Sequence, residues 1–185
     1  MREKLLAALA LLPLAGCAFL GGVAEREKVY GKATPVISES FASPIVKMGE
    51  NWLLYLNASD PDGDMDRIVC SIDFQDGVGL PYPTGITIIR KDQLKNLSGY
   101  FYLDTSGQYG PMQIILTLQI RDKAGHYSAP LSFSVSIVEP SSKENRQEEP
   151  PAGIFQEENL GPLMISLTSE IGYFKNPGGF DEGMY

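Results

Sequence analysis

"MQIILTLQIR", Met112 to Arg121, decides the fold class, because apolar and polar residues alternate along the run. The apolar positions are Met112, Ile114, Leu116, Leu118 and Ile120. Successive side chains of a strand point to opposite faces, so this period predicts a strand with one buried and one solvated face. "LSFSVSIV", residues 131–138, repeats the pattern with serines on the solvated side. Both runs are typical of half-buried antiparallel strands.

Five further strand-like runs lie upstream of this pair. They begin at Thr34, Trp52, Arg67, Gly85 and Leu97. Turns rich in Gly, Pro and Asp separate them, which gives about seven short strands between residues 34 and 138. Because each sheet has to bury one apolar face, we expect an all-β fold, a single seven-stranded antiparallel β-sandwich. A small barrel is the alternative.

The first residues of the chain have the organisation of an export signal. Arg2 and Lys4 precede the apolar run "LLAALALLPL", residues 5–14, which is too short to span a bilayer. The run ends in "LAGC", residues 14–17, which closely resembles the lipobox of bacterial lipoproteins. The resemblance implies a signal peptide over residues 1–16, cleavage before Cys17 and lipidation of Cys17. An ordinary secretory signal is the alternative.

Such a lipid implies a membrane-anchored protein of the bacterial cell envelope. Ala18, in place of the aspartate that often retains lipoproteins at the inner membrane, favours the outer membrane. Residues 17–33 are expected to form a flexible tether, and residues 139–152, "EPSSKENRQEEPPA", a disordered linker.

The tail, residues 153–185, becomes apolar again after this linker. Its apolar residues fit a helical stripe, formed by Leu160, Leu163, Met164, Leu167, Ile171 and Phe174. Strand alternation at Leu163, Ile165 and Leu167 competes with the helix. We expect a short helix or strand that docks on the sandwich, stays disordered or binds a partner.

"IRDKAGHYSAPLSFSVSI", residues 120–137, resembles the last hairpin of bacterial Ig-like domains, with His126 where that family often has asparagine. Together with "DPDGD", residues 60–64, the middle of the chain resembles an Ig-like or cadherin-like module over residues 34–138. Removal of the signal peptide leaves Cys70 as the only unmodified cysteine, so the Ig disulfide is excluded. Its alternation with Ile68 and Ile72 favours a small core residue.

"ASDPDGDMDRIV", residues 58–69, concentrates four aspartates in seven positions, namely Asp60, Asp62, Asp64 and Asp66. An EF-hand loop is excluded, because no register places Gly at position 6 and Glu at position 12. If the loop joins strands B and C, the "DKAGH" turn lies at the same end of the sandwich, and Asp122 could complete a Ca²⁺ site. A tight turn without metal is the simpler interpretation.

"GYFYL", residues 99–103, puts Tyr100 and Tyr102 on one face of a strand, opposite Phe101. Two exposed tyrosines would suit protein binding or stacking on a carbohydrate. Ordinary cross-strand pairing is the alternative. Coplanar, exposed rings would favour the carbohydrate.

The formal net charge of −8 disfavours nucleic acid as a partner. His126 is the only histidine, and no acid–base pair has a catalytic spacing, so we expect a protein without enzymatic activity. No cofactor is required, although Ca²⁺ binding stays open. We therefore expect an envelope lipoprotein that binds a protein or supports structure, with carbohydrate binding or Ca²⁺-stabilised adhesion as alternatives.

Overall fold

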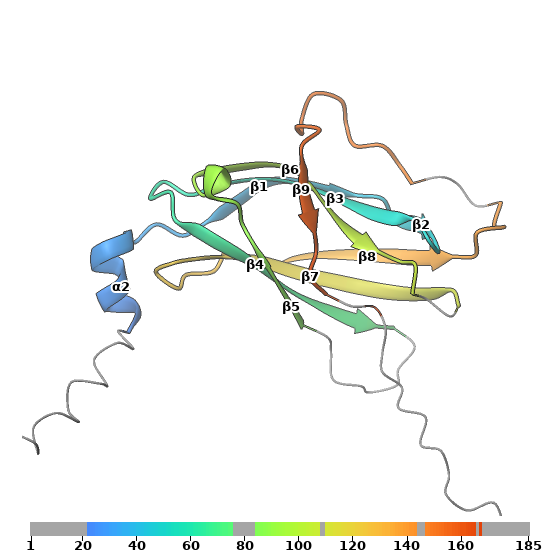
Figure 1. Cartoon of the computed structure of the whole chain (residues 1–185), viewed down its shortest axis with the longest axis horizontal. Helices are drawn as coiled ribbons and strands as arrows, with labels where there is room; N and C mark the ends of the chain where they lie inside the picture. Colours follow the sequence, from blue (N-terminus) through green and yellow to red (C-terminus); the bar gives the residue numbers. More distant parts are fainter. Residues whose placement is uncertain (1–21, 76–83, 108–109, 144–146, 166, 168–185) are drawn as a thin grey trace, which may run out of the picture.

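A computed structural model describes residues 22–75, 84–107, 110–143, 147–165 and 167. Residues 1–21, on which the expected signal peptide and Cys17 fall, and residues 168–185 lie outside the described residues. Two β-sheets pack face to face as a sandwich, which confirms the predicted architecture (Figure 1).

The first sheet has the order β1-β3-β6-β9, and the second has the order β2-β8-β7-β4-β5. The first sheet consists of β1 (Val36–Ala42), β3 (Asn51–Ser59), β6 (Asn96–Asp104) and β9 (Asn159–Pro162). The second consists of β2 (Ile45–Lys47), β8 (Leu131–Val138), β7 (Met112–Asp122), β4 (Met65–Phe74) and β5 (Thr84–Ile88). The helix α2 (Val23–Tyr30) precedes β1, and the 3₁₀ turn η2 (Lys91–Gln93) joins β5 to β6.

The strand order is that of an immunoglobulin-like sandwich. β3 pairs with β6 in one sheet, and β4, β7 and β8 are antiparallel neighbours in the other, as strands B and E and strands C, F and G are. β9 lies beside β6, the place that strand D takes in a constant-type domain. Among the described residues between β5 and β6 there is no strand, only the turn η2. The position of strand D is therefore taken by the C-terminal segment.

The prediction of seven strands, all antiparallel, is wrong in two respects. The described residues form nine strands, and the two additional ones, β2 and β9, pair in parallel with β8 and β6. β2 arises because the chain leaves the first sheet after β1 and continues in the second, where the carbonyl of Pro44 accepts a hydrogen bond from the amide of Ser136. β9 arises from the tail.

The alternating strands bury one apolar face each, and together they form a single core. Met65, Ile72 and Phe101 are among its fully buried side chains. Trp52 lies edge-on to Phe133 at 6.3 Å between ring centroids, and its Nε1 donates a 2.7 Å hydrogen bond to the carbonyl of Ser43. Each large side chain buried in this way contributes roughly 1.5–3 kcal/mol. Cys70 lies in the same core, as its alternation predicts.

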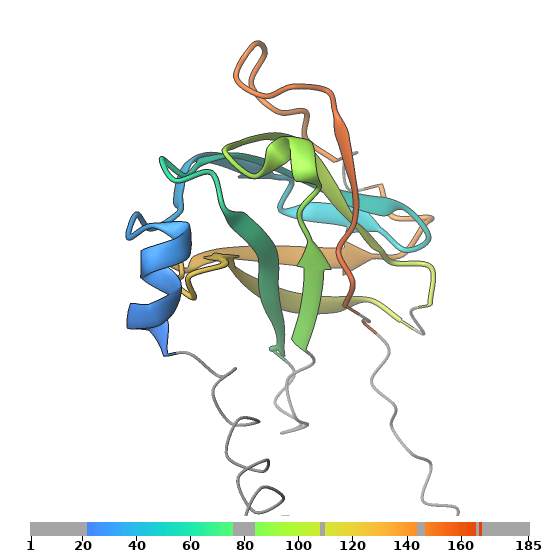
Figure 2. The same ribbon diagram turned by 60° about the vertical axis from the view of Figure 1, so that its left-hand side comes forward.

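The tail completes this core along the open side between β5 and β6 (Figure 2). Leu160, Leu163 and Leu167 are buried among the residues of the sandwich. Two glycines make room for the segment: a Cβ at Gly85 would lie 2.5 Å from the carbonyl oxygen of Met164, and one at Gly99 would lie 2.4 Å from that of Glu158. The described part of the tail contains a strand and no helix, but this strand, β9, ends at Pro162, before the alternation predicted at Leu163, Ile165 and Leu167.

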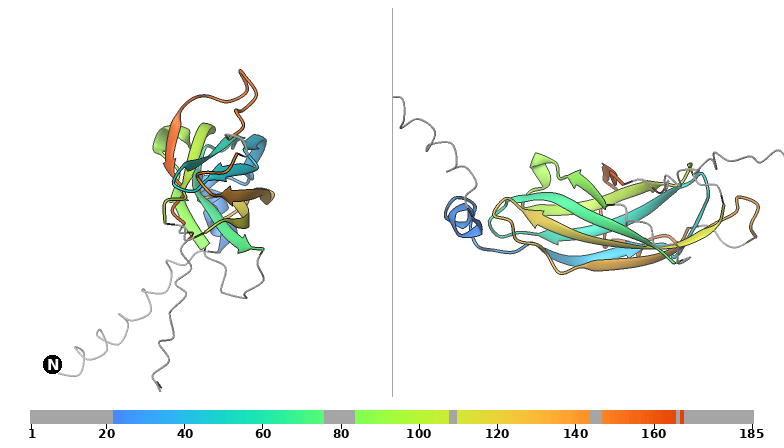
Figure 3. Two further views of the ribbon diagram at one scale, coloured as in Figure 1. Left: turned by 90° about the vertical axis from the view of Figure 1, so that its right-hand side faces the viewer. Right: turned by 90° about the horizontal axis from the view of Figure 1, so that it is seen from below.

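Part of the expected tether forms α2, which lies at one end of the elongated sandwich (Figure 3). None of its residues is buried, so the helix contributes no core packing. Of the expected linker, the structure describes residues 139–143 and 147–152, and the second of these stretches contacts the sandwich. The side-chain amide of Gln147 donates to the carbonyl of Asn51 at 2.8 Å and accepts from the amide of Leu53 at 3.1 Å.

Candidate functional site

The aspartate-rich loop between β3 and β4 is a tight turn built on Asp60. One carboxylate oxygen of Asp60, Oδ1, accepts a 2.9 Å hydrogen bond from the amide of Asp62, and its carbonyl accepts one from the amide of Gly63. Gly63 has a φ of +74°, which glycine adopts without strain. The amide of Asp60 is bonded to the carbonyl of Lys95. The local chemistry is thus that of a turn, as the simpler interpretation has it.

The turn between β7 and β8 is built in the same way on Asp122. Oδ1 of Asp122 accepts hydrogen bonds from the amides of Gly125 and His126, at 2.5 and 2.7 Å. Oδ2 lies 2.8 Å from Nδ1 of His126. The side chain of Asp122 is therefore fixed by its own turn.

The two turns bring three carboxylates together. Ligand atoms of Asp60, Asp64 and Asp122 all lie within 4.8 Å of one another, and the residues are only 1%, 5% and 1% exposed. Within the described part of the chain, Oδ2 of Asp60 and both oxygens of Asp64 have no hydrogen-bond partner. In the same described part of the chain, neither Asp60 nor Asp64 takes part in a salt bridge.

The environment of Asp64 disfavours its charged form. Burial raises the pKa of Asp64, and the nearby carboxylates of Asp60 and Asp122 raise it further. The nearby backbone amide of Ala124, which makes no hydrogen bond of normal geometry to this carboxylate, opposes the rise only in part. A cation between the three side chains would offset both the burial and the repulsion, because it supplies the missing partner and neutralises the negative charges. Ca²⁺ prefers such clustered oxygen ligands, and the donor set fits it.

Two of the predicted ligands do not join the cluster. Oδ2 of Asp62 accepts a 2.7 Å hydrogen bond from the amide of Ala33, and the carboxylate of Asp66 pairs with Arg67 at 2.5 Å. The register of β4 on β7 shifts between Met65 and Arg67, and Met65 is fully buried while Asp66 is not. The structure therefore brings together three of the five predicted residues.

The contacts of His126 could not be predicted from the sequence. Its Nε2 lies 3.1 Å from Oε1 of Glu27 on α2, while its Nδ1 faces Asp122. The contact with Glu27 and then that with Asp122 raise the pKa of His126. Both contacts are hydrogen bonds only when both ring nitrogens carry a proton. Because 99 residues separate Glu27 from His126, no local motif could have identified the pair.

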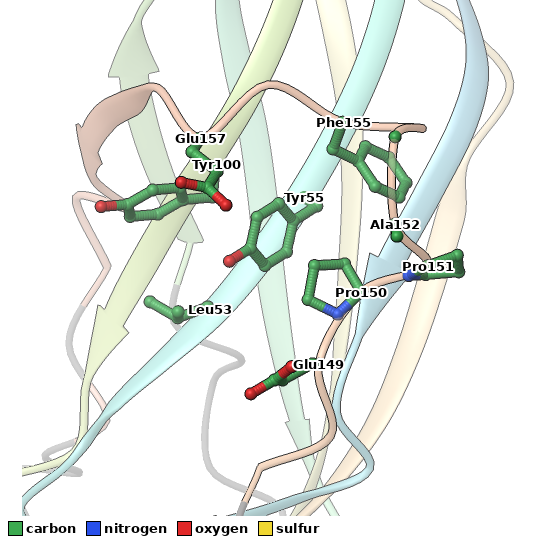
Figure 4. A pocket seen from close by; sticks show the side chains of 10 residues that line it. Leu53, Tyr55, Tyr100, Glu149, Pro150, Pro151, Ala152, Phe155 and Glu157 are labelled. Carbon is green, nitrogen blue, oxygen red and sulfur yellow. The ribbon is translucent and has the colours of Figure 1, made fainter.

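The predicted tyrosine face is organised differently. Tyr100 lies next to Tyr55 of β3, with ring centroids 5.4 Å apart and an interplanar angle of 48°. Tyr55 in turn lies 5.6 Å from Phe155, at 51° (Figure 4). Tyr102 is outside this row, beside β9. Inclined, half-buried rings do not form the coplanar platform that would favour a carbohydrate.

No known family model matches the chain, and no curated protein matches it. Two solved structures show distant similarity, each over 58% of this chain. One is the PKD domain of an M14-like peptidase from Thermoplasmatales archaeon SCGC AB-540-F20, at 15% identity, 98% coverage of that chain and a TM-score of 0.29. The other is the CARDB domain of a Pyrococcus furiosus protein in complex with di-metal ions, at 12% identity, 88% coverage and a TM-score of 0.26.

Similarity at this level transfers neither a ligand nor a function, so the fold assignment rests on the strand order itself. In the part of the chain that the structure describes, no helix is long and apolar enough to cross a bilayer.

Proposed function

We propose that this protein is a lipid-anchored, non-enzymatic binding module of the bacterial cell envelope, whose loop end is stabilised by Ca²⁺. The lipid is attached to Cys17, and the sandwich presents binding surfaces to a partner protein. Asp60, Asp64 and Asp122 hold the ion between the β3–β4 and β7–β8 turns.

One observation carries the metal part of the proposal. Asp64 is 95% buried, yet neither of its carboxylate oxygens has a hydrogen-bond partner among the described residues. A buried polar group without a partner costs roughly 1–3 kcal/mol, and more when it is charged. Because the neighbouring side chains of Asp60 and Asp122 are also carboxylates, the partner that Asp64 lacks has to be positively charged. A bound cation offsets this cost, whereas a turn alone does not.

The absence of enzymatic activity has its own support. The chain contains a single histidine, and both of its ring nitrogens face carboxylates. It is therefore engaged in holding the turn and α2 together and is not free to move a substrate proton. The only free cysteine among the described residues, Cys70, is buried.

Thermal unfolding in EDTA and in millimolar Ca²⁺ tests the metal site. At ten times the dissociation constant, Ca²⁺ adds about 1.4 kcal/mol, which raises the melting temperature by roughly 5 °C. Asp66→Asn is the matched control, because it removes a neighbouring carboxylate, at the start of β4, that pairs with Arg67 and is not part of the cluster. It should keep the full shift, whereas Asp60→Asn should lose it. Identical melting curves in EDTA and Ca²⁺ would reject the site.

The anchor is tested separately in the expressing cell. The wild-type protein should incorporate labelled fatty acid and partition into detergent, and Cys17→Ser should do neither. Labelling of the Cys17→Ser variant would contradict this part of the proposal.

A further inference from the structure

A groove lies on the outer face of the first sheet, beneath residues 149–157. Leu53, Tyr55 and Tyr100 form its floor, and the covering segment supplies Glu149, Pro150, Pro151, Ala152, Gly153, Phe155 and Glu157 (Figure 4). The groove has a volume of about 550 Å³. Sites for small ligands and side chains commonly have this size.

Both ends of the covering segment are attached to the sheet, so the groove exists before a ligand arrives. Before the groove, Gln147 pairs with the backbone of β3, and the amide of Glu148 donates to Oγ of Ser43 at 3.0 Å. After it, Nδ2 of Asn57 donates to the carbonyl of Ile154 at 2.8 Å, and the carbonyl of Glu158 accepts from the amide of Tyr100. A preformed site loses little entropy on binding.

The lining combines aromatic rings with negative charge. Tyr100, Tyr55 and Phe155 form a continuous row of rings, and Glu149 and Glu157 are the charged residues of the lining. Among the residues that the structure describes, no lysine, arginine or histidine lines the groove. Burial raises the pKa of the Tyr55 phenol, and the nearby Tyr100, Glu157 and Glu149 raise it further, which agrees with the negative charge of the two glutamates in the lining.

Aromatic faces and carboxylates in one groove are complementary to an organic cation. A guanidinium stacks on aromatic rings and pairs with carboxylates through a planar fork of donors. An anion would be repelled by the two glutamates, and a sugar requires a flatter ring surface. Arginine therefore suits the lining better than the more strongly hydrated lysine.

We propose that the groove formed by Tyr55, Tyr100, Phe155, Glu149 and Glu157 binds an arginine side chain of a partner protein. The inference rests on the proposed binding function and names the chemistry of the partner. The guanidinium lies against the ring row, and its charge is balanced by the two glutamates.

The test follows backbone amide signals of the full-length protein by NMR during titration with a short, blocked peptide, Gly-Gly-Arg-Gly-Gly. Saturable shifts are expected for residues 53–57 and 147–157, with a dissociation constant in the millimolar range, because one side chain supplies the contact. The same peptide with citrulline keeps the shape of arginine without its charge, and it should bind at least tenfold more weakly.

Matched variants assign the binding to the groove. The double substitution Glu149→Gln/Glu157→Gln should weaken the arginine peptide at least fivefold. Glu39→Gln/Glu50→Gln removes the same charge outside the lining and should leave binding unchanged. Tyr55→Phe keeps the ring and should retain binding, whereas Tyr55→Ala should lose it with the fold intact in the spectrum.

The inference is overturned by the absence of a saturable shift at millimolar peptide, by equal binding of the citrulline peptide, or by equal weakening by both double variants. Shifts that map to another face would reject the groove and leave the proposed binding module standing. Binding in the groove without any effect of Ca²⁺ on melting would reject the metal site alone.

Discussion

The backbone amide of Lys123 donates a 3.1 Å hydrogen bond to the carbonyl oxygen of Asp64. This bond, together with the pairing of Met65 with Asp122 across β4 and β7, holds the two turns in register through the backbone. The carboxylates of Asp64 and Asp122 are therefore kept close whether or not an ion neutralises them. Like charges separated by about 5 Å repel by on the order of 3 kcal/mol at an effective dielectric constant of 20. In the metal-free protein this repulsion lowers the free energy of unfolding.

Asp64→Asn should consequently stabilise the metal-free protein at neutral pH, by roughly 1–3 kcal/mol. The same variant should no longer respond to Ca²⁺, because it removes a charged ligand. Urea unfolding in EDTA and in Ca²⁺ measures both effects, with Asp66→Asn as control. A loss of stability in EDTA would contradict the repulsion.

The raised pKa of Asp64 also fixes a pH dependence. Because the folded-state pKa lies above the unfolded value, the favourable contribution is fully present below the unfolded pKa and is lost as the pH rises through the folded pKa. In EDTA, Asp64→Asn should lack this part of the decline, which the wild type shows as the pH rises from the unfolded pKa of an aspartate, about 3.9, through the raised folded-state pKa. Parallel pH profiles of the two proteins would rule out the assignment.

His126 should connect α2 to the sandwich mainly in its protonated form. Its folded-state pKa is raised, so the contact contributes stability below the unfolded pKa and loses it as the pH rises through the folded pKa. As the only histidine, it gives a single imidazole titration by proton NMR. Glu27→Gln should move that titration to lower pH, and Glu25→Gln should leave it in place. An unmoved titration in Glu27→Gln would show that α2 is not docked.

The tail should behave as part of the core. Leu163→Ala, at a position that is 4% exposed, should cost about 2–4 kcal/mol in urea unfolding. Met164→Ala is the adjacent control, because Met164 is 64% exposed and its loss should cost less than about 0.5 kcal/mol. Equal, small effects of the two substitutions would mean that the tail is not docked.

Cys70 should be unreactive in the folded protein. Burial raises its pKa to about 11, and the thiolate is the reactive form. In a Cys17→Ser background, a thiol reagent at pH 8 should modify Cys70 only as fast as the protein unfolds, and denaturant should accelerate the reaction. Rapid modification without denaturant would contradict the core position.

The sequence predicted those features that follow from local periodicity and shared topology. Strand-like runs located seven of the nine strands, all except β2 and β9, and the common end of two loops predicted that Asp122 approaches Asp60, Asp62 or Asp64. Features that depend on contacts between distant polar segments were not predictable. Gln147 pairs with β3 through its side-chain amide, and β9 docks in parallel beside β6. Neither contact produces a hydrophobic period in the sequence. The groove also needs Tyr55 from β3 and Phe155 from the tail, and both reach Tyr100 through contacts between segments that are distant in the sequence.

The parallel direction of β9 has a mechanical consequence. β6 begins beside the Asp60 turn and runs away from it, so β9 also runs away from the end of the sandwich where α2 lies. The chain enters the domain at one end and is heading toward the other when it leaves β9. A pulling force applied between Val36 and Leu167 would therefore load β1 against β3, and β9 against β6, along the strands. Their hydrogen bonds would share the load in shear and would not open one after another, a geometry suited to a domain held under tension.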